Sequence, residues 1–269
     1  IGTDATGNNK NGADYQGSMA DFLMLVIVDK TENTYSFLQF NRDTMTEVAL
    51  IDHNGEGEAT ANIQLCTAHW YGGNREQSCE NTVKSVKKLL GGIQIDGYYE
   101  LNMNEIPKLN SMVDGVTVTL EDDFSKKYPK MKKGATINLD DEQAYAYVHD
   151  RYGVGDEENA SRMKRQQQYM TGFFKKLQEK VKANPNYANE VFESLQDVST
   201  TDITIGKISN ISNIFASGTD KGIFQLAGKS KIGQALGDEM DHMEFYVNKK
   251  AMVSTMSELF GIVEQKNKE

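Results

Sequence analysis

Residues 149–168 read HDRYGVGDEENASRMKRQQQ, and this stretch joins a group of basic side chains to the start of a long helix. Its arginines and central lysine are Arg151, Arg162, Lys164 and Arg165. An apolar helical pattern follows over residues 169–177. Arginine presents a planar set of donors that suits carboxylate or phosphate oxygens. The stretch therefore predicts either an anion-binding site or a solvated helix face paired with the acids at 156–158.

A second arginine beside an acid follows a strand-like run earlier in the chain. Residues 22–28, FLMLVIV, form a continuous apolar run that is typical of a fully buried strand, and residues 34–40 alternate enough to be its partner. Polar groups gather at strand ends in open α/β sheets. The residues expected to share one rim of the sheet are Asp4, Asp21, Arg42 and Asp43.

Strand-like and helical segments alternate along the rest of the chain. Further strands are expected at 93–101, 116–120, 224–226 and 243–247. Helices are expected at 62–70, 80–90, 104–112, 140–147, 187–195, 204–216 and 251–260, with a long one ending near 182. This alternation favours a three-layer α/β/α domain with a central mixed β-sheet. No linker is long or polar enough to mark a boundary, so we predict one domain over residues 1–269.

Charge and composition exclude some classes of function. The formal net charge of −10 argues against nucleic-acid binding, which needs a basic footprint. Any anion site must therefore be a local basic pocket in a repelling field. No window approaches the roughly 18 apolar residues of a transmembrane helix. The sequence opens at Ile1 without an initiator methionine, so we expect that an upstream segment has been removed.

The chain has two cysteines, Cys66 and Cys79. They flank a glycine-containing loop and show no spacing typical of a metal site. Their spacing fits two free thiols in a cytosolic protein and one local disulfide in an oxidising compartment equally well.

A series of short motifs extends over nearly the whole chain. In order, they are Gly2-Thr3-Asp4, Asp21 before an apolar strand, Asn41-Arg42-Asp43-Thr44, Ala61-Asn62-Ile63 with Gly72-Gly73, residues 114–118, 144–151 and 161–167, Thr201-Asp202-Ile203 and Leu226-Ala227-Gly228. Their order and spacing together resemble the LytR-CpsA-Psr family of cell-envelope proteins.

This resemblance implies a transferase at the extracytoplasmic face of the bacterial membrane, held there by an anchor upstream of the present sequence. Such a protein moves an anionic glycopolymer, such as a teichoic acid or capsule polymer, from a polyprenyl pyrophosphate carrier to peptidoglycan. The resemblance also implies Mg²⁺, an apolar tunnel for the lipid and no nucleic-acid partner. Outside the membrane a disulfide persists, so we expect Cys66 and Cys79 to be bonded.

The resemblance also assigns roles to individual residues. Asp4 and Asp21 would hold Mg²⁺ against the pyrophosphate, since magnesium prefers a few carboxylates together with phosphate oxygens. The pyrophosphate would be bound by Arg42, His149, Arg151, Arg162, Arg165 and Gln166, whose cations neutralise charge as the bond to the sugar breaks. The residues implied in catalysis are Asp21, Arg42, Asp43, Arg151 and Arg162. Either Asp21 or Asp43 would assist deprotonation of the attacking hydroxyl.

The chain departs from the family pattern at four positions. The family usually has arginine at the positions of Thr6, Met19 and His149, and aspartate at that of Asn159. Histidine restores the lost charge only partly at neutral pH. The departures leave two alternatives to the enzyme: a member that binds polyprenyl phosphates or wall glycans without turnover, and a regulator of the cell envelope.

Overall fold

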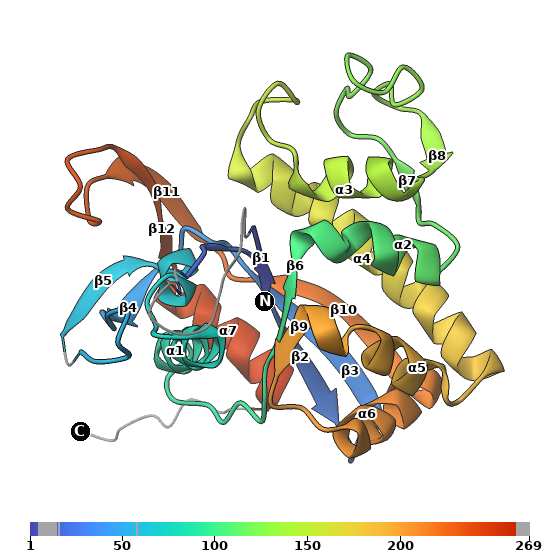
Figure 1. The fold of residues 1–269 in the computed structure, drawn as a ribbon, viewed down its shortest axis with the longest axis horizontal. Helices are drawn as coiled ribbons and strands as arrows, with labels where there is room; N and C mark the ends of the chain where they lie inside the picture. Colours follow the sequence, from blue (N-terminus) through green and yellow to red (C-terminus); the bar gives the residue numbers. More distant parts are fainter. Residues whose placement is uncertain (5–14, 16, 58, 262–269) are drawn as a thin grey trace.

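A six-stranded sheet forms the centre of the computed structural model, which describes residues 1–4, 15, 17–57 and 59–261. The strand order is β10-β3-β2-β1-β6-β9 (Figure 1). The strands are β1 Gly2–Thr3, β2 Ala20–Asp29, β3 Thr34–Phe40, β6 Tyr99–Asn102, β9 Ser199–Thr201 and β10 Thr219–Gln225. The pairs β10/β3 and β1/β6 are parallel and the other three are antiparallel, which confirms the predicted mixed sheet.

Helices cover both faces of this sheet. On one face lie α1 (Arg75–Leu89) and α7 (Lys249–Phe260), and on the other lie α4 (Asn159–Ala183) and α6 (Ile205–Ser217). Val86 of α1 and Met256 of α7 share a core with Leu38 of β3. On the opposite face the ring of Phe174 of α4 stacks on Phe37 of β3, with centroids 4.1 Å apart. Neighbouring residues of a strand point to opposite faces, so these contacts establish the three predicted layers.

Two sets of smaller elements extend from the layers on either side of the rim where the predicted site residues lie. One set holds α2 (Ile106–Met112), α3 (Asp141–His149) and the hairpin of β7 (Thr117–Thr119) and β8 (Thr136–Asn138), with α5 (Tyr187–Ser194) below it. The other set holds two hairpins, β4 (Met45–Ala49) with β5 (Thr60–Gln64) and β11 (Gly228–Gly233) with β12 (His242–Val247). Three short 3-10 helices complete the description: η1 Leu65–His69, η2 Met103–Glu105 and η3 Gln196–Val198.

Local sequence determines where α3 begins and where it ends. Asp140 and Gln143 form a capping box at its N-terminus, in which each side chain accepts a hydrogen bond from the other residue's backbone N–H. The helix ends at His149, and Asp150 is already extended. The change of direction there turns His149 and Arg151 towards the rim of the sheet.

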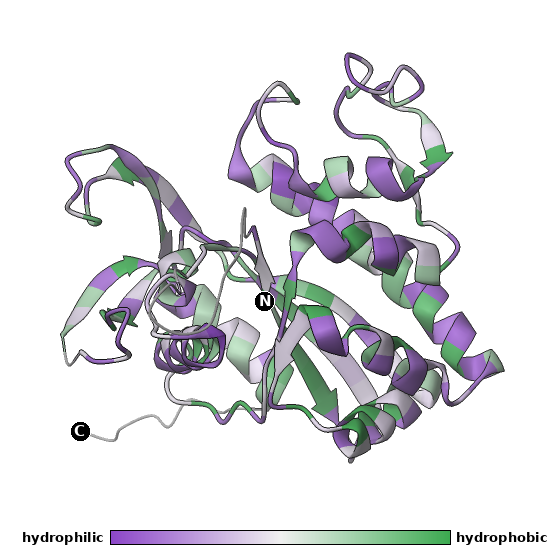
Figure 2. Cartoon of the chain, viewed as in Figure 1, coloured by the Kyte–Doolittle hydropathy of each residue, from purple (hydrophilic) through white to green (hydrophobic). Residues whose placement is uncertain are grey.

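Some predicted elements were wrong. The predicted helix at 62–70 is strand β5 followed by η1, and only residues 99–101 of the strand predicted at 93–101 belong to β6. Figure 2 shows the strongly apolar colouring of β2, yet β2 is not fully buried, since Val26 is 51% exposed. The register explains this: β1 pairs with β2 only at Ala20 and Phe22, so further along β2 has a single partner, β3, among the described residues.

The described helices include none that is both long enough and apolar enough to cross a membrane.

Candidate anion-binding site

The sheet register gathers the predicted rim residues. Thr3 of β1 lies opposite Ala20 of β2, and Leu23 of β2 lies opposite Phe40 of β3. Three residues that flank these pairs, Asp4, Asp21 and Arg42, therefore emerge at one edge of the sheet. The N-terminal turn of α4 faces this edge and contributes Asn159 and Arg162. We call Asp21, Arg42 and Arg162 the arginine cluster.

Both arginines of the cluster bind one carboxylate. Nη1 of Arg42 donates to Oδ1 of Asp21, and Nη2 of Arg162 lies 3.2 Å from the same oxygen. The side chains are largely buried, with 18% of Arg42, 9% of Asp21 and 6% of Arg162 exposed. With Asp43 3.5 Å from Nε of Arg42, the two arginines here face two carboxylates, and Arg151 acts on Asp43 as a third cation. This third cation gives the partly desolvated rim the positive charge that a further anion needs.

Several N–H donors of Arg42 do not meet a strong hydrogen-bond acceptor. Its Nη2 faces two sulfur atoms, Sδ of Met19 at 3.0 Å and Sγ of Cys66 at 3.4 Å, and sulfur is a weak acceptor. Its Nε has no hydrogen-bond partner among the described residues, although Oδ1 of Asp43 lies 3.5 Å away. A guanidinium carries five N–H donors, and the two acids beside Arg42 do not use them all, so it keeps donors for a further acceptor.

Asn159 links the cluster to Asp43. Its Oδ1 accepts from Nη2 of Arg162 at 2.8 Å, while its Nδ2 donates to Oδ1 of Asn41 at 3.0 Å and Oδ2 of Asp43 at 3.3 Å. Burial raises the pKa of the Asp43 carboxyl, although nearby Arg42 and Arg162 act to lower it. Asn159 is a departure from the family pattern, and here it serves as a neutral bridge between a cation and an anion.

His149 lies between two acids. Its Nε2 is 3.2 Å from Oδ2 of Asp4 and its Nδ1 is 3.2 Å from Oδ1 of Asp150, while its ring stacks on Tyr145. Hydrogen bonding to Asp150 and then to Asp4 raises the pKa of His149, although burial opposes this effect. Oδ2 of Asp150 also accepts from Nζ of Lys127 at 3.2 Å. His149 therefore connects the predicted magnesium ligand Asp4 to the surface lysine.

The other predicted phosphate ligands lie in different settings. Arg165 is 1% exposed, and its donors go to the carbonyl oxygens of Tyr147 at 2.9 Å and Asp150 at 2.5 Å and to Oδ2 of Asp122 at 2.5 Å. In this structure the donors of Arg165 hold the end of α3, and its role as a pyrophosphate ligand stays a prediction. Arg151 stacks on Tyr152, 4.7 Å from the ring centroid, and is partly exposed.

Gln166 marks the inner end of the site. Its Nε2 donates to the carbonyl oxygen of Val148 at 3.1 Å, and its Oε1 accepts from Nε2 of Gln39 at 3.2 Å. Gln166 and Val148 also line a cavity of about 220 Å³, whose other walls are mostly apolar and include Leu109, Phe173 and Leu195. An apolar cavity thus begins next to the polar rim.

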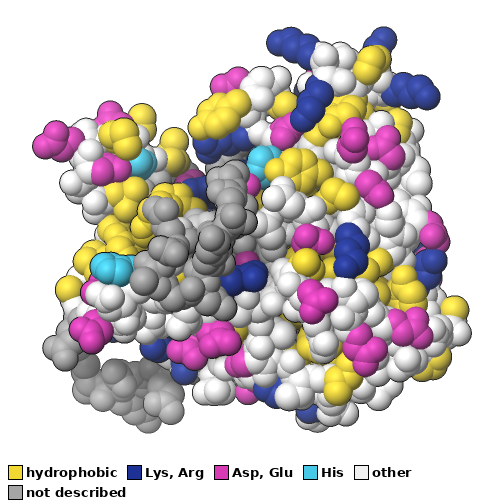
Figure 3. All heavy atoms as spheres, in the orientation of Figure 1, with side chains coloured by type: hydrophobic (Ala, Val, Ile, Leu, Met, Phe, Trp, Pro, Cys, Tyr) yellow, Lys and Arg dark blue, Asp and Glu magenta, His cyan; other side chains and the backbone are white. Residues whose placement is uncertain are grey.

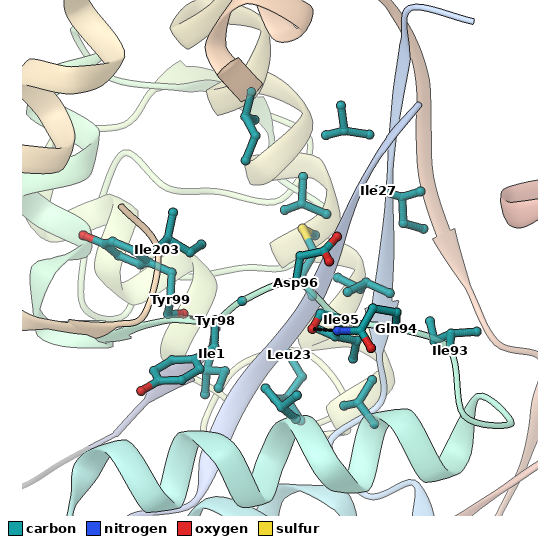
Figure 4. Close-up of a pocket in the computed structure, with 18 of the residues that line it drawn as sticks. Ile1, Leu23, Ile27, Ile93, Gln94, Ile95, Asp96, Tyr98, Tyr99 and Ile203 are labelled. Atoms are coloured by element: carbon teal, nitrogen blue, oxygen red, sulfur yellow. Dashed lines mark hydrogen bonds between the residues drawn. The ribbon is translucent and has the colours of Figure 1, made fainter. Parts of the chain in front are cut away.

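A larger cavity of about 810 Å³ lies beside β2 (Figure 4). It shares Phe22, Tyr99 and Met170 with the smaller one, so the two adjoin. Figure 4 labels Leu23 and Ile27 of β2 among its lining residues, together with Ile93, Ile95 and Tyr98 from the segment between α1 and β6. This space follows the edge of β2 that has no strand partner in the described chain.

The predicted disulfide is wrong. Cys66 and Cys79 are both free and buried, and each has its own neighbour. Sγ of Cys66 faces Arg42, whereas Sγ of Cys79 lies 3.7 Å from Nε2 of His69. Burial raises the pKa of the Cys66 thiol to about 11 and that of Cys79 to about 12, so both stay protonated.

The departures from the family pattern fall in three settings. Met19 and Asn159 contact Arg42 and Arg162 directly, and His149 reaches Asp4. Thr6 lies outside the described residues. The residues that sequence reasoning missed are Asn41, Asp150 and Lys127, although Asn41 and Asp150 lie within motifs that it had singled out.

A scan against protein families matches the LytR_cpsA_psr family over residues 1–260. The chain belongs to the LytR-CpsA-Psr family. The teichoic acid transferase of Bacillus cereus (strain AH820) named "Polyisoprenyl-teichoic acid--peptidoglycan teichoic acid transferase TagU" is 29% identical over 168 residues, which are 61% of this chain and 50% of that protein. The chain thus matches about half the length of this curated relative.

Two solved structures share the fold. The protein gbs0355 from Streptococcus agalactiae has a TM-score of 0.74 at 20% identity, over 96% of this chain and 84% of that one. The structure "TagT bound to LI-WTA" has a TM-score of 0.68 at 20% identity, over 96% and 87%. At this identity the likeness concerns the fold, and it supports the same α/β/α architecture.

Proposed function

We propose that this LytR-CpsA-Psr protein transfers an anionic glycopolymer from a polyprenyl pyrophosphate carrier to peptidoglycan at the outer face of the bacterial membrane. The observation that carries the proposal is the position of the arginine cluster beside an apolar cavity. A lipid pyrophosphate needs both features within one molecule's reach, because its head is an anion and its tail is a hydrocarbon. The name of the Bacillus cereus relative, a teichoic acid transferase, supports the same class of reaction.

The chemistry follows from the positions of the side chains. An acceptor hydroxyl of peptidoglycan attacks the phosphorus that carries the sugar, the P–O bond to the second phosphate breaks, and polyprenyl phosphate leaves. The free donors of Arg42, together with Arg162, stabilise the charge on the transferring phosphoryl oxygens. Arg151 adds a partly exposed cation at the entrance.

Asp43 is the better of the two candidate bases. An oxygen of Asp21 contacts two guanidinium groups, which makes this carboxylate a weaker proton acceptor. The carboxyl of Asp43 has a pKa raised by burial, which makes its carboxylate a stronger proton acceptor. In this proposal Asp43 receives the proton of the attacking hydroxyl.

Asp4 and Asp21 would hold Mg²⁺ together with phosphate oxygens of the substrate. The described residues contain no group of three or more metal-ligating side chains, so the protein alone offers too few ligands. This fits magnesium, which binds one or two carboxylates and completes its shell with phosphate and water. When bound, the ion would neutralise part of the pyrophosphate charge.

The lipid tail would start in the smaller cavity. Its walls are mostly apolar side chains and it begins at Gln166, next to the rim. The larger cavity is bordered by the edge of β2, whose peptide groups beyond Phe22 lack a strand partner on that side in the described chain. A hydrocarbon cannot satisfy such groups. These peptide groups make the larger cavity the less suitable place for the first part of the tail. The smaller cavity alone is below the usual size of ligand sites, so the rest of a long tail would continue into the larger one.

The departures at Met19 and His149, where the family usually has arginine, favour a second function. With fewer cations around the phosphate, the protein would bind lipid phosphates without turnover. An assay of polyprenyl phosphate release from a synthetic lipid-linked sugar, with peptidoglycan fragments as acceptor, separates the two. The enzyme predicts Mg²⁺-dependent release that Asp43→Asn abolishes. Tight lipid binding without release in the wild type would replace the enzyme with the binding protein.

The place of the tail has its own test. Leu109 lines only the smaller cavity and Val83 only the larger one. Leu109→Trp should weaken binding of a long-chain polyprenyl phosphate about tenfold while leaving that of a short-chain analogue unchanged, and Val83→Trp serves as the matched control. A stronger effect of Val83→Trp would place the first part of the tail along β2 instead.

A further inference from the structure

A lysine-rich loop connects β7 and β8. Residues 126–133, KKYPKMKK, hold five lysines in eight positions of a chain with a net charge of −10, and all five are exposed. We call these residues the lysine segment. Figure 3 shows Lys and Arg side chains gathered on this part of the molecule, above α3 in the view of Figure 1.

The lysine segment has a defined shape. Met131 within it is fully buried and Phe124 just before it is 3% exposed, and both belong to the core beneath α3. Backbone hydrogen bonds close the loop, among them Met131 N–H to the oxygen of Tyr128 at 2.8 Å and Phe124 N–H to the oxygen of Met131 at 2.9 Å. The apolar side chains point inwards, so the lysines are presented outwards by a packed scaffold.

Most of these lysines have no acidic partner. Lys127 pairs with Asp150, but Lys126, Lys130, Lys132 and Lys133 form no ion pair with any described residue. Of the acids just upstream, Asp122 pairs with Arg165. Asp123 accepts from the N–H of Ser125 at 2.8 Å and also from the backbone of Lys133, and it lies near enough to Lys132 to interact with its charge. Four like charges held close together repel one another, and an external anion would relieve that repulsion.

The segment is joined to the phosphate site by a chain of polar contacts. Lys127 contacts Asp150, Asp150 contacts His149, and His149 contacts Asp4, at 3.2 Å for each step. Figure 3 shows a hollow beside this part of the molecule, on the side of the rim. These contacts thus run from the rim to Lys127 through the carboxylates of Asp4 and Asp150 and place the lysine segment next to the site.

We infer that the lysine segment binds the repeating, negatively charged part of the glycopolymer while its phosphate end occupies the arginine cluster. This inference rests on the proposed function and deepens it, because it assigns a binding surface to the charged repeats of the polymer. Evenly spaced charges of a polymer match exposed ammonium groups, which are mobile point charges with no fixed hydrogen-bond geometry.

An anionic membrane is the other partner that four lysines would suit. Interfacial binding combines cations with apolar side chains that enter the bilayer. Within residues 121–138 no large hydrophobic side chain is exposed, because Phe124 and Met131 are buried and Tyr128 is partly buried. The segment therefore has the cations of a membrane-binding loop without its apolar anchors, which favours the polymer.

The test compares two variants that each lose four positive charges. The first carries Lys126→Gln, Lys130→Gln, Lys132→Gln and Lys133→Gln. The matched control carries Lys175→Gln, Lys182→Gln, Lys249→Gln and Lys250→Gln, which are also exposed and form no ion pair with a described residue. Lys127 is kept in both because it pairs with Asp150.

The probes are a lipid-linked sugar without charged repeats, the same molecule extended by about ten glycerol phosphate units, and vesicles containing phosphatidylglycerol. We expect the first variant to lose about tenfold in affinity for the extended substrate, with unchanged affinity for the short one, and the control to stay within about twofold of wild type for both. The advantage of the extended substrate in the wild type should also fall with added salt.

The outcomes separate the two levels of the proposal. Equal loss in both variants, or no loss in either, would overturn the role of the lysine segment while leaving the transferase intact. Selective loss of vesicle binding in the first variant would overturn it in favour of a membrane. Failure of the wild type to bind even the short substrate would instead contradict the proposed function itself.

Discussion

The arginines at the rim and the lysines of the 126–133 segment carry the same charge in opposite settings. Arg162 and Arg165 are buried and bound to acids or carbonyl oxygens, whereas Lys126 and Lys130 are exposed and form no ion pair with a described residue. Arginine suits the first setting because its planar fork fixes direction, and lysine suits the second because its ammonium adapts to a moving partner.

The difference separates two kinds of anion recognition. Removing a buried cation leaves an acid without its partner inside the protein, so both fold and function suffer. Removing an exposed lysine affects only whatever binds there. We therefore expect the losses of stability and of function on substitution to decrease from the buried arginines to the surface lysines.

The largest effect should come from Arg165→Met. This change leaves Asp122 and two carbonyl oxygens without their donor in a place where the arginine is 1% exposed. Loss of one partner of a buried pair costs about 3–5 kcal/mol. Urea unfolding should show this loss of stability, and lipid phosphate affinity of the folded protein should change little. Weaker binding at unchanged stability would return Arg165 to the phosphate site.

Arg42→Ala should come next, and its cost to stability should be smaller than its effect on function, because Asp21 keeps Arg162 as a partner. It removes the donors that have no strong acceptor, and loss of one preorganised donor reduces rate about 10²–10³-fold. Binding of a long-chain polyprenyl phosphate should weaken by at least about 1 kcal/mol in calorimetry. Arg42→Lys is the matched control, because it keeps the charge and loses the fork. Wild-type affinity in Arg42→Ala would exclude Arg42 from the site.

A smaller effect is expected for the acids of the cluster. Asp4→Asn and Asp21→Asn should each weaken Mg²⁺ binding about tenfold or more, and only when a pyrophosphate lipid analogue is present. Without the analogue, wild type and variants should all bind Mg²⁺ poorly, since the described residues offer no group of three or more ligands. Equal affinity in Asp21→Asn and wild type, with the analogue present, would show that other groups hold the ion.

His149 should produce a few-fold effect that depends on pH. Contacts with Asp150 and Asp4 raise its pKa above 6.5, so the charged imidazole is favoured in the fold. Its contribution to stability is then complete below about pH 6.5 and is lost as the pH rises through the higher folded value. Transfer should likewise increase as the pH falls towards 6, and His149→Arg should be more active with a flatter profile. A profile unchanged in His149→Arg would assign the pH dependence to another group.

The contrast also explains what the sequence could and could not predict. The strands β2 and β3 were predictable because apolar runs and alternation record burial directly, and their ends placed Asp21, Arg42 and Asp43 together. The hairpin β4/β5 and the strand β11 were missed because short strands with exposed polar residues leave no such pattern, whereas β12 matches the strand predicted at 243–247. Arg162 and Arg165 lie three residues apart in the same motif, but only contacts from α3 distinguish their roles.

For a related reason, the sequence could not show that Cys66 and Cys79 remain unbonded. Spacing sets the length of a loop but not the direction of a side chain. Cys66 on η1 points to Arg42, whereas Cys79 on α1 points to His69. Likewise the sequence at 93–98 is apolar enough for a strand, but the residues have no neighbouring strand to pair with in the described chain.

The smallest effect should be that of the lysine segment on stability. The variant that replaces Lys126, Lys130, Lys132 and Lys133 by glutamine removes exposed charges without breaking any ion pair among the described residues, and surface substitutions of this kind stay within about 0.5 kcal/mol. The mutual repulsion of the lysines also disappears, so the change should be neutral or slightly stabilising.

Urea unfolding is the suitable measurement for this variant, because guanidinium salt would screen the charges under test. Adding Lys127→Gln sharpens the comparison within the segment itself. Only that lysine pairs with an acid, so the fifth substitution should lower stability, by less than about 1 kcal/mol, where the first four did not. A loss of more than about 1 kcal/mol from the first four would mean that these lysines hold the fold together, and the division between buried arginines and free lysines would not stand.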